Sequence, residues 1–179
     1  MMTHTTLMNS SSNSSQKTSM KQGSWRDVKI FYEVLSSQER ENLLEQSKPL
    51  LGKVSELHPG LQTDTNLNEV FTGKEFYNPF PKFCDLINVD AELVSAWVNC
   101  IDSEVKLSWH THTDFYPEYR YSSVYMLDNP ESLGTAFLME DAEYHLPAPT
   151  NSLLVFPSNY THSNPLVQST RYTLAMDFS

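Results

Sequence analysis

The second half of the chain, from about Glu92 onward, consists of short runs rich in β-branched and aromatic residues, with turn-forming residues between them. The clearest turn signals are Asp128-Asn129-Pro130 and Pro147-Ala148-Pro149. A succession of short strands with little helix between them predicts a mainly β protein, a sandwich or jelly roll. The predicted strands are Leu93–Cys100, Lys106–His112, Tyr119–Leu127, Ala136–Met139, Ser152–Phe156 and Tyr172–Phe178.

The first half of the chain has fewer strand-like runs and contains polar, helical and loop-like segments. Residues 1–24 are rich in serine, threonine and asparagine and contain no acidic residue, so we expect a disordered tail. Residues 25–179 are expected to form a single domain, starting with a strand over Val28–Tyr32. Ser36 and Glu39 have the spacing of a capping box, which predicts a helix after Ser36, and we expect one or two N-terminal helices in all. Residues 58–81 are interpreted as a long loop region that borders the substrate.

Composition restricts the classes of function. The formal net charge of −10 argues against a general nucleic-acid binder, because phosphate contacts need clustered lysine and arginine. No apolar run is long enough to span a bilayer, and the start of the chain lacks the apolar stretch of a secretory signal. We therefore expect a cytoplasmic protein without membrane partners, in which Cys84 and Cys100 are reduced thiols.

Three polar clusters interrupt the predicted strands: Trp109–Asp114, Phe156–His162 and Arg171–Thr173. Residues two apart on a strand share a face, so His112 and Asp114 are expected to reach one metal ion together. With His162 added, they form the two-histidine, one-carboxylate set of a non-haem iron(II) site, which leaves coordination positions open for substrates and O₂. The predicted catalytic and metal-ligating residues are therefore His112, Asp114 and His162.

His110 shares the face of His112 and leaves an alternative open. If His110 replaces Asp114, the site becomes a three-histidine set, as in many cupins. We favour the set with Asp114, in which His110 is a neighbouring wall of the pocket. His58 and His145 lie outside the three clusters and are interpreted as structural or surface residues.

The third cluster predicts an anion site. Arg171 and Thr173 share a strand face, and a guanidinium with a hydroxyl holds a carboxylate with good geometry. An arginine buried in a small barrel needs an anion, and the distal carboxylate of 2-oxoglutarate supplies one. Tyr125, and less directly Tyr121 or Ser123, are further candidates to contact that carboxylate.

The three polar clusters, together with Ala96–Asn99, Tyr121–Leu127 and Leu153–Pro157, resemble the corresponding segments of the 2-oxoglutarate/iron(II) oxygenases of bacteria and phages. The chain is more distantly similar to the prolyl-hydroxylase-like branch, in which Gly134–Phe137 would match a glycine-rich strand; here Gly134 stands alone where a pair is common. The resemblance covers about residues 92–179. It implies a double-stranded β-helix that binds Fe(II), 2-oxoglutarate and O₂, with ascorbate as a candidate reductant. The implied reaction hydroxylates a substrate and releases succinate and CO₂.

Two other functions remain open at this stage. One is a cupin-type metalloenzyme without 2-oxoglutarate, using His110, His112 and His162. The other is a non-catalytic jelly-roll binding or structural protein. The primary substrate is a protein side chain, a free amino acid, a nucleobase or a small metabolite, and we expect residues 58–90 and 115–120 to determine which.

Overall fold

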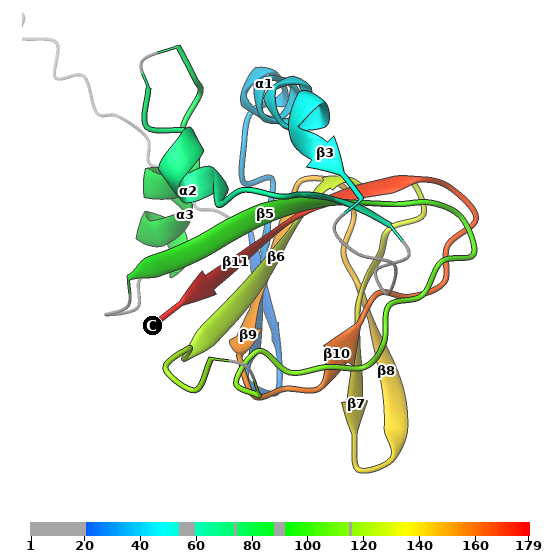
Figure 1. Cartoon of the computed structure of the whole chain (residues 1–179). Helices are drawn as coiled ribbons and strands as arrows, with labels where there is room; N and C mark the ends of the chain where they lie inside the picture. The colour runs from blue at the N-terminus through cyan, green and yellow to red at the C-terminus, as the bar shows by residue number, and fades with distance from the viewer. Residues whose placement is uncertain (1–20, 54–59, 74, 88–91, 115) are drawn as a thin grey trace, which may run out of the picture.

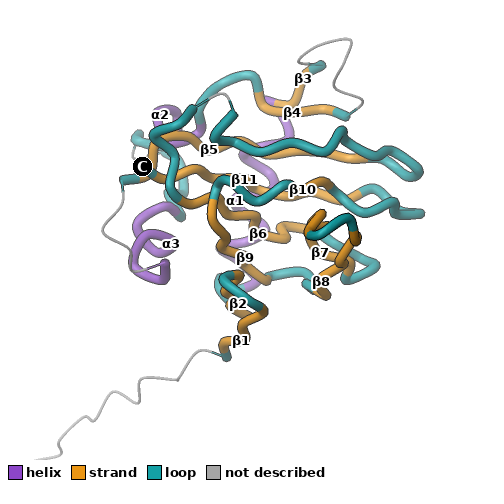
Figure 2. The backbone as a smooth tube through the Cα atoms, turned by 90° about the horizontal axis from the view of Figure 1, so that it is seen from below, coloured by secondary structure: helices purple, strands orange, loops and turns teal. Residues whose placement is uncertain are grey.

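The computed structural model describes residues 21–53, 60–73, 75–87, 92–114 and 116–179. Its strands form two antiparallel sheets that face each other, as Figure 1 shows. The larger sheet has the strand order β1-β2-β9-β6-β11-β5-β4-β3, which can be followed from bottom to top in Figure 2, and the smaller has the order β10-β7-β8. The strands are β1 Gln22–Trp25, β2 Val28–Tyr32, β3 Leu51–Gly52, β4 Leu61–Thr63, β5 Leu93–Ile101, β6 Tyr121–Asp128, β7 Leu133–Met139, β8 Ala142–Pro147, β9 Ser152–Pro157, β10 His162–Ser163 and β11 Arg171–Phe178.

Three α-helices cover the outer face of the large sheet (Figure 1). They are α1 Ser37–Ser47, followed by a 3-10 turn over Lys48–Leu50, α2 Leu67–Val70 and α3 Phe80–Ile87. The predicted capping box is confirmed: the Ser36 hydroxyl accepts from the Glu39 amide, and the Glu39 carboxylate accepts from the Ser36 amide. None of the described helices is long and apolar enough to cross a bilayer.

The central strands are buried on both faces, which explains their near-continuous apolar runs. On β9, Leu153 and Val155 pack against the helices, whereas Leu154 and Phe156 face the small sheet. On β11, Leu174 and Met176 face the helices. The alternate residues of β11, from Arg171 to Asp177, therefore face the space between the sheets, and this space holds the polar clusters found in the sequence.

Most predicted strands are confirmed, but three expectations changed. Gln22–Trp25 pairs with β2, so the predicted tail boundary at residue 24 falls inside a strand, and residues 1–20 lie outside the described part. The loop region predicted over 58–81 holds β4, α2 and the start of α3. β4 and α2 are too short to produce a hydrophobic period, and local contacts such as the Asn66 cap of α2 define them. α3 does have such a period, since Phe80, Phe83 and Ile87 are buried on one face, and the prediction missed it.

The predicted strand over Lys106–His112 is wrong, since the segment is an extended loop with a single bridge between His110 and His162. Apart from this bridge, side chains, and not a neighbouring strand, form hydrogen bonds with its backbone amide and carbonyl groups. The Leu107 amide donates to the Asn164 side chain at 2.6 Å, and the Ser163 hydroxyl donates to the Leu107 carbonyl at 2.7 Å. The loop thus lies against β10 without joining either sheet, and it carries two histidines between them.

Candidate metal centre and co-substrate site

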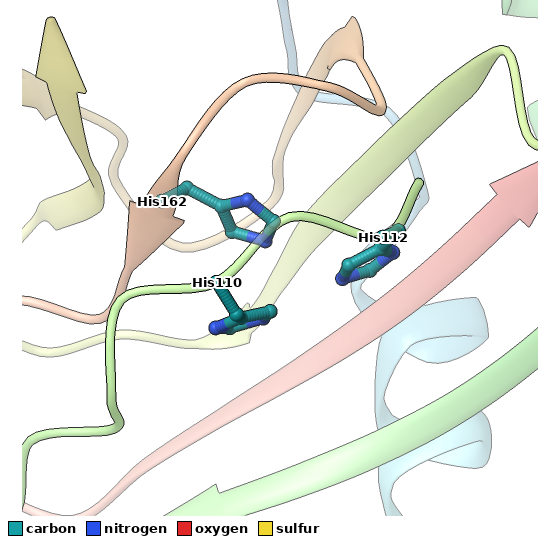
Figure 3. A group of neighbouring side chains, drawn as sticks. All are labelled: His110, His112 and His162. Atoms are coloured by element: carbon teal, nitrogen blue, oxygen red, sulfur yellow. The ribbon is translucent and has the colours of Figure 1, made fainter. Parts of the chain in front are cut away.

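Three histidines converge between the sheets, as Figure 3 shows. One ligand nitrogen from each of His110, His112 and His162 lies within 4.8 Å of the other two. The ring centroids are 4.4 Å apart for His110 and His162, 5.0 Å for His112 and His162, and 5.4 Å for His110 and His112. The backbone holds this arrangement, because His110 and His162 exchange hydrogen bonds of 3.2 and 2.9 Å.

In each ring the Nδ1 atom faces an oxygen acceptor. Nδ1 of His110 lies 2.8 Å from the Ser108 carbonyl, and Nδ1 of His162 lies 2.9 Å from the Tyr160 carbonyl. A carbonyl only accepts, so both Nδ1 atoms carry the proton and Nε2 is the ligand atom of each ring. Metal-bound histidines are oriented in this way, and the donor set fits a divalent transition metal.

His112 has the strongest orienting partner. Its Nδ1 lies 2.5 Å from Oδ1 of Asp177 and 3.1 Å from the Ser122 hydroxyl. The Ser122 hydroxyl donates to the same Asp177 oxygen at 2.7 Å and lies 3.0 Å from the Ser158 hydroxyl. A carboxylate behind a ligating histidine fixes the ring and raises its basicity.

This role of Asp177 was not among the predictions from the sequence. The available signal was an acidic residue inside the apolar run Tyr172–Phe178, since a carboxylate that is almost fully buried must have donors nearby. Ser122, its hydrogen-bond partner, lies opposite Asp177 on β6.

Burial keeps His162 neutral. His162 is only 5% exposed, and burial, followed by the nearby His110 and His112 rings, lowers its pKa to about 3. The imidazole therefore retains its ligand lone pair throughout the neutral range. Phe156 packs edge-on against this ring at 4.9 Å and excludes water from it.

Asp114, predicted as the third ligand, lies in a turn after His112 and is exposed. Its amide donates to the Thr111 hydroxyl at 3.2 Å, which closes that turn. The rule that alternate residues share a face holds only on a strand, and the chain has left extended structure at this point. The structure thus brings His110, His112 and His162 together, whereas Asp114 is outside the group of converging ligand atoms.

Arg171 is a buried cation at the start of β11, only 3% exposed. Its Nη1 donates to the carbonyls of Leu133 and Gly134 at 3.1 and 3.4 Å, where a bulge in β7 turns these groups toward it. Burial lowers the pKa of Arg171 to about 10, with the field of Glu131 opposing the shift, so the guanidinium is charged at neutral pH. Its Nε atom is buried and has no hydrogen-bond partner among the described residues, so the group fits a further anionic acceptor.

Gly134 is required at that bulge. A Cβ atom placed there would contact the Leu146 carbonyl and lie 2.8 Å from the Ala148 Cβ, and these atoms belong to the neighbouring chain segment at β8. Only a residue without a side chain permits this close approach.

The other predicted co-substrate residues divide between two faces. Thr173 is buried on the same face of β11 as Arg171. Tyr125 lies on the opposite face of β6, where its ring packs against Phe83 at 5.1 Å and its hydroxyl donates to the Asn151 side chain. Tyr125 therefore belongs to the core under the helices, and the structure does not bring it to Arg171.

Asn99 is a buried polar residue that the sequence analysis did not single out for the site. It lies opposite Thr173 on β5, and its Oδ1 is buried without a hydrogen-bond partner among the described residues. Buried amide oxygens are normally paired, so Asn99 is a further group to which a polar ligand would bind.

Comparison with solved structures identifies the class of fold. A 2OG-Fe(II) oxygenase family oxidoreductase from Burkholderia pseudomallei matches with a TM-score of 0.65 and 13% identity, over 86% of this chain and 84% of that one. The viral collagen prolyl hydroxylase of Paramecium Bursaria Chlorella virus-1, solved as a 2OG complex, matches with a TM-score of 0.62 and 11% identity, over 85% and 95%. The non-heme alpha ketoglutarate dependent epimerase SnoN from nogalamycin biosynthesis matches with a TM-score of 0.68 and 10% identity, over 86% and 77%.

These likenesses confirm the predicted double-stranded β-helix, the fold that the 2-oxoglutarate/iron(II) oxygenases share. No protein-family model matches the chain, and no curated protein matches its sequence.

The depressed pKa of His162 predicts a pH dependence of stability in the metal-free protein. Between pH 6.5 and about 3 the unfolded chain protonates this residue and the folded chain does not, so stability falls as pH falls through that window. From pH 7 to pH 5 the loss attributable to His162 is expected to be about 2 kcal/mol. Urea unfolding of the native chain and of His162→Gln at both pH values measures it. Equal losses in the two proteins would contradict the assignment.

The contact between Asp177 and His112 predicts a role in metal binding. In Asp177→Asn the ring of His112 loses its carboxylate acceptor, and we expect metal affinity to fall about 10- to 100-fold. Titration with Fe(II) or Co(II), followed by absorbance or calorimetry, gives the affinity. Asp85→Asn, an exposed position on α3, is the matched control and should bind metal as the native chain does. An unchanged affinity in Asp177→Asn would show that Asp177 does not position His112.

Proposed function

We propose that the protein is an iron(II)- and 2-oxoglutarate-dependent dioxygenase that hydroxylates a substrate and releases succinate and CO₂. The observation that carries the proposal is the convergence of three histidine nitrogens between the sheets of this fold. The same fold buries Arg171, whose Nε has no hydrogen-bond partner among the described residues. The named activities of the similar structures support the reaction class.

The proposed metal ligands are His112 and His162, together with either His110 or Asp114 as the third. In the described arrangement His110 supplies the third nitrogen. Asp114 follows His112 by two residues and is exposed, so a rearrangement of the turn would be needed for its carboxylate to replace His110. Either set of three ligands leaves coordination positions of the metal open for substrates.

The proposed 2-oxoglutarate site extends along the inner face of β11. Arg171 and Asp177 lie six residues apart on this strand, about 20 Å at the usual rise per residue. The arginine side chain reaches inward from one end and the Asp177–His112 pair from the other, which leaves a span suited to a five-carbon dicarboxylate. Arg171, with Thr173 beside it and Asn99 opposite, would bind the distal carboxylate.

Iron, when bound with 2-oxoglutarate and O₂, supplies the oxidation of an unactivated C–H bond. The chain's own residues bind and orient the reactants. His110, His112 and His162 fix the metal position, Arg171 anchors the dicarboxylate, and Phe156 and Trp97 exclude water around the histidine rings. The disordered tail, now limited to the residues before β1, the single domain after it, the cytoplasmic location and the lack of nucleic-acid partners all remain predictions.

The test of this proposal is 2-oxoglutarate turnover without added substrate, in the presence of Fe(II) and ascorbate. Succinate formation is expected, and Arg171→Ala should raise the 2-oxoglutarate concentration needed for half-maximal rate by at least about 10-fold, because a charge-assisted contact worth about 1.5–3 kcal/mol is lost. Arg26→Ala, which removes a surface arginine that stacks on Trp25, is the control. Turnover with an unchanged 2-oxoglutarate requirement in Arg171→Ala would remove Arg171 from the site.

The third ligand is decided by comparing His110→Ala with Asp114→Ala. If His110 completes the site, His110→Ala lowers iron affinity and turnover at least about 10-fold, whereas Asp114→Ala retains both. The reverse result would assign the third position to Asp114, and His145→Ala, on the exposed β8 surface, should change neither property.

The three-histidine arrangement also favours a second candidate, a cupin-type metalloenzyme that does not use 2-oxoglutarate. Anaerobic titration of the iron-loaded protein with 2-oxoglutarate separates the two. Only the dioxygenase should give the weak visible charge-transfer band of the chelated metal.

A further inference from the structure

A pocket of about 360 Å³ opens beside His112. It is lined by Gln62–Asn66, Ser95–Trp97, Tyr116, Tyr119 and Asp177. Two of these residues join it to the metal centre: Asp177 hydrogen-bonds to His112, and the Trp97 ring lies 5.8 Å from the His112 ring. A group bound in this pocket would therefore lie beside His112, one of the three histidines of the cluster.

The lining of this pocket is aromatic and acidic. Trp97, Tyr116 and Tyr119 contribute three aromatic rings, and the two tyrosine rings stack at 4.9 Å. Its charged residues are Asp64 and Asp177, and none of the lining residues is a lysine, arginine or histidine. An anionic group would meet two carboxylates here, whereas a purely apolar group would desolvate the exposed Asp64 carboxylate without compensation.

The pocket wall is held in place by hydrogen bonds that do not depend on a ligand. The Asn66 side chain accepts from the Ala96 amide at 2.9 Å, and the Thr63 hydroxyl accepts from the Val98 amide at 3.1 Å, so polar side chains cover the edge of β5. On the other side, the Tyr116 amide donates to the His112 carbonyl at 3.0 Å. The aromatic and acidic groups are thus presented by a preorganised surface.

We propose that this pocket binds a positively charged nitrogen group of the primary substrate, an alkylammonium or guanidinium. Such a group is attracted by the faces of the aromatic rings and by the carboxylates of Asp64 and Asp177 together. The proposal rests on the dioxygenase function above and adds the substrate class. It places the C–H bond to be hydroxylated on the part of the substrate that extends from the charged nitrogen toward the histidines.

Binding is tested with three blocked tripeptides of the form acetyl-Gly-Xaa-Gly-amide, in which Xaa is lysine, norleucine or glutamate. Titration calorimetry or NMR with the metal-free protein measures each affinity. The lysine peptide is expected to bind at least about 10-fold more tightly than the norleucine peptide, and the preference should weaken as salt is raised. An arginine peptide tests whether a guanidinium serves equally well. Equal affinity for norleucine, or tighter binding of the glutamate peptide, would overturn the proposal.

Two variants test whether the preference for the lysine peptide over the norleucine peptide arises in this pocket. Asp64→Asn removes one charge at nearly constant shape, and Tyr116→Leu removes one ring, so each should weaken lysine-peptide binding about 2- to 5-fold without weakening that of the norleucine peptide. Asp141→Asn, at the exposed turn between β7 and β8, is the matched control. Unchanged lysine-peptide affinity in Asp64→Asn would refute the assignment even if Tyr116→Leu proved unstable.

Succinate formation separates failure of this inference from failure of the proposed function. Stimulation of 2-oxoglutarate turnover by the lysine peptide and not by norleucine would support both. Turnover in the absence of any preference for the cation would overturn the pocket assignment and leave the dioxygenase intact. Selective binding of the lysine peptide by a protein that never consumes 2-oxoglutarate would support a cation pocket and refute the dioxygenase.

Discussion

The orientation of three imidazole rings is the constraint on which the rest of the site depends. Each Nδ1 atom is held by an oxygen: a loop carbonyl for His110, a turn carbonyl for His162 and the Asp177 carboxylate for His112. Because these acceptors lie on the outer side of the rings, all three Nε2 atoms are directed to one region between the sheets. The acceptors come from segments far apart in the sequence, so the site forms only when both sheets are packed together.

The two ends of β11 carry opposite charges, and each end is therefore suited to a ligand of a different charge. Arg171 at one end is a buried cation with neutral carbonyl partners, and Asp177 at the other end is a buried acid paired to a histidine. A buried charge without a counter-charge is costly, so the arginine end is suited to an incoming carboxylate. The acidic end opens into the aromatic pocket, which is suited to the opposite charge. One strand face thus separates the proposed sites for co-substrate and substrate.

Predictions from the sequence succeeded where the signal was local or periodic. The Ser36–Glu39 capping box, the strand at Val28–Tyr32 and most strands after Glu92 are present, because side-chain alternation and turn residues act over a few positions. Cys84 and Cys100 are free thiols, as predicted. The strand predicted over Lys106–His112 failed, since Asn164 and Ser163, more than fifty residues away, supply its hydrogen bonds. No local pattern encodes such a contact.

The sequence by itself determined the class of fold and the presence of histidines, an arginine and carboxylates suited to metal and anion chemistry. Only the tertiary structure decided which of them meet: His110 lies with His112 and His162, Asp177 supports His112, and Tyr125 faces the helices. The physical reason is that a two-residue period predicts faces only while the chain remains in a strand. At His112 the chain turns, and from there the packing of the two sheets against each other fixes where each side chain lies.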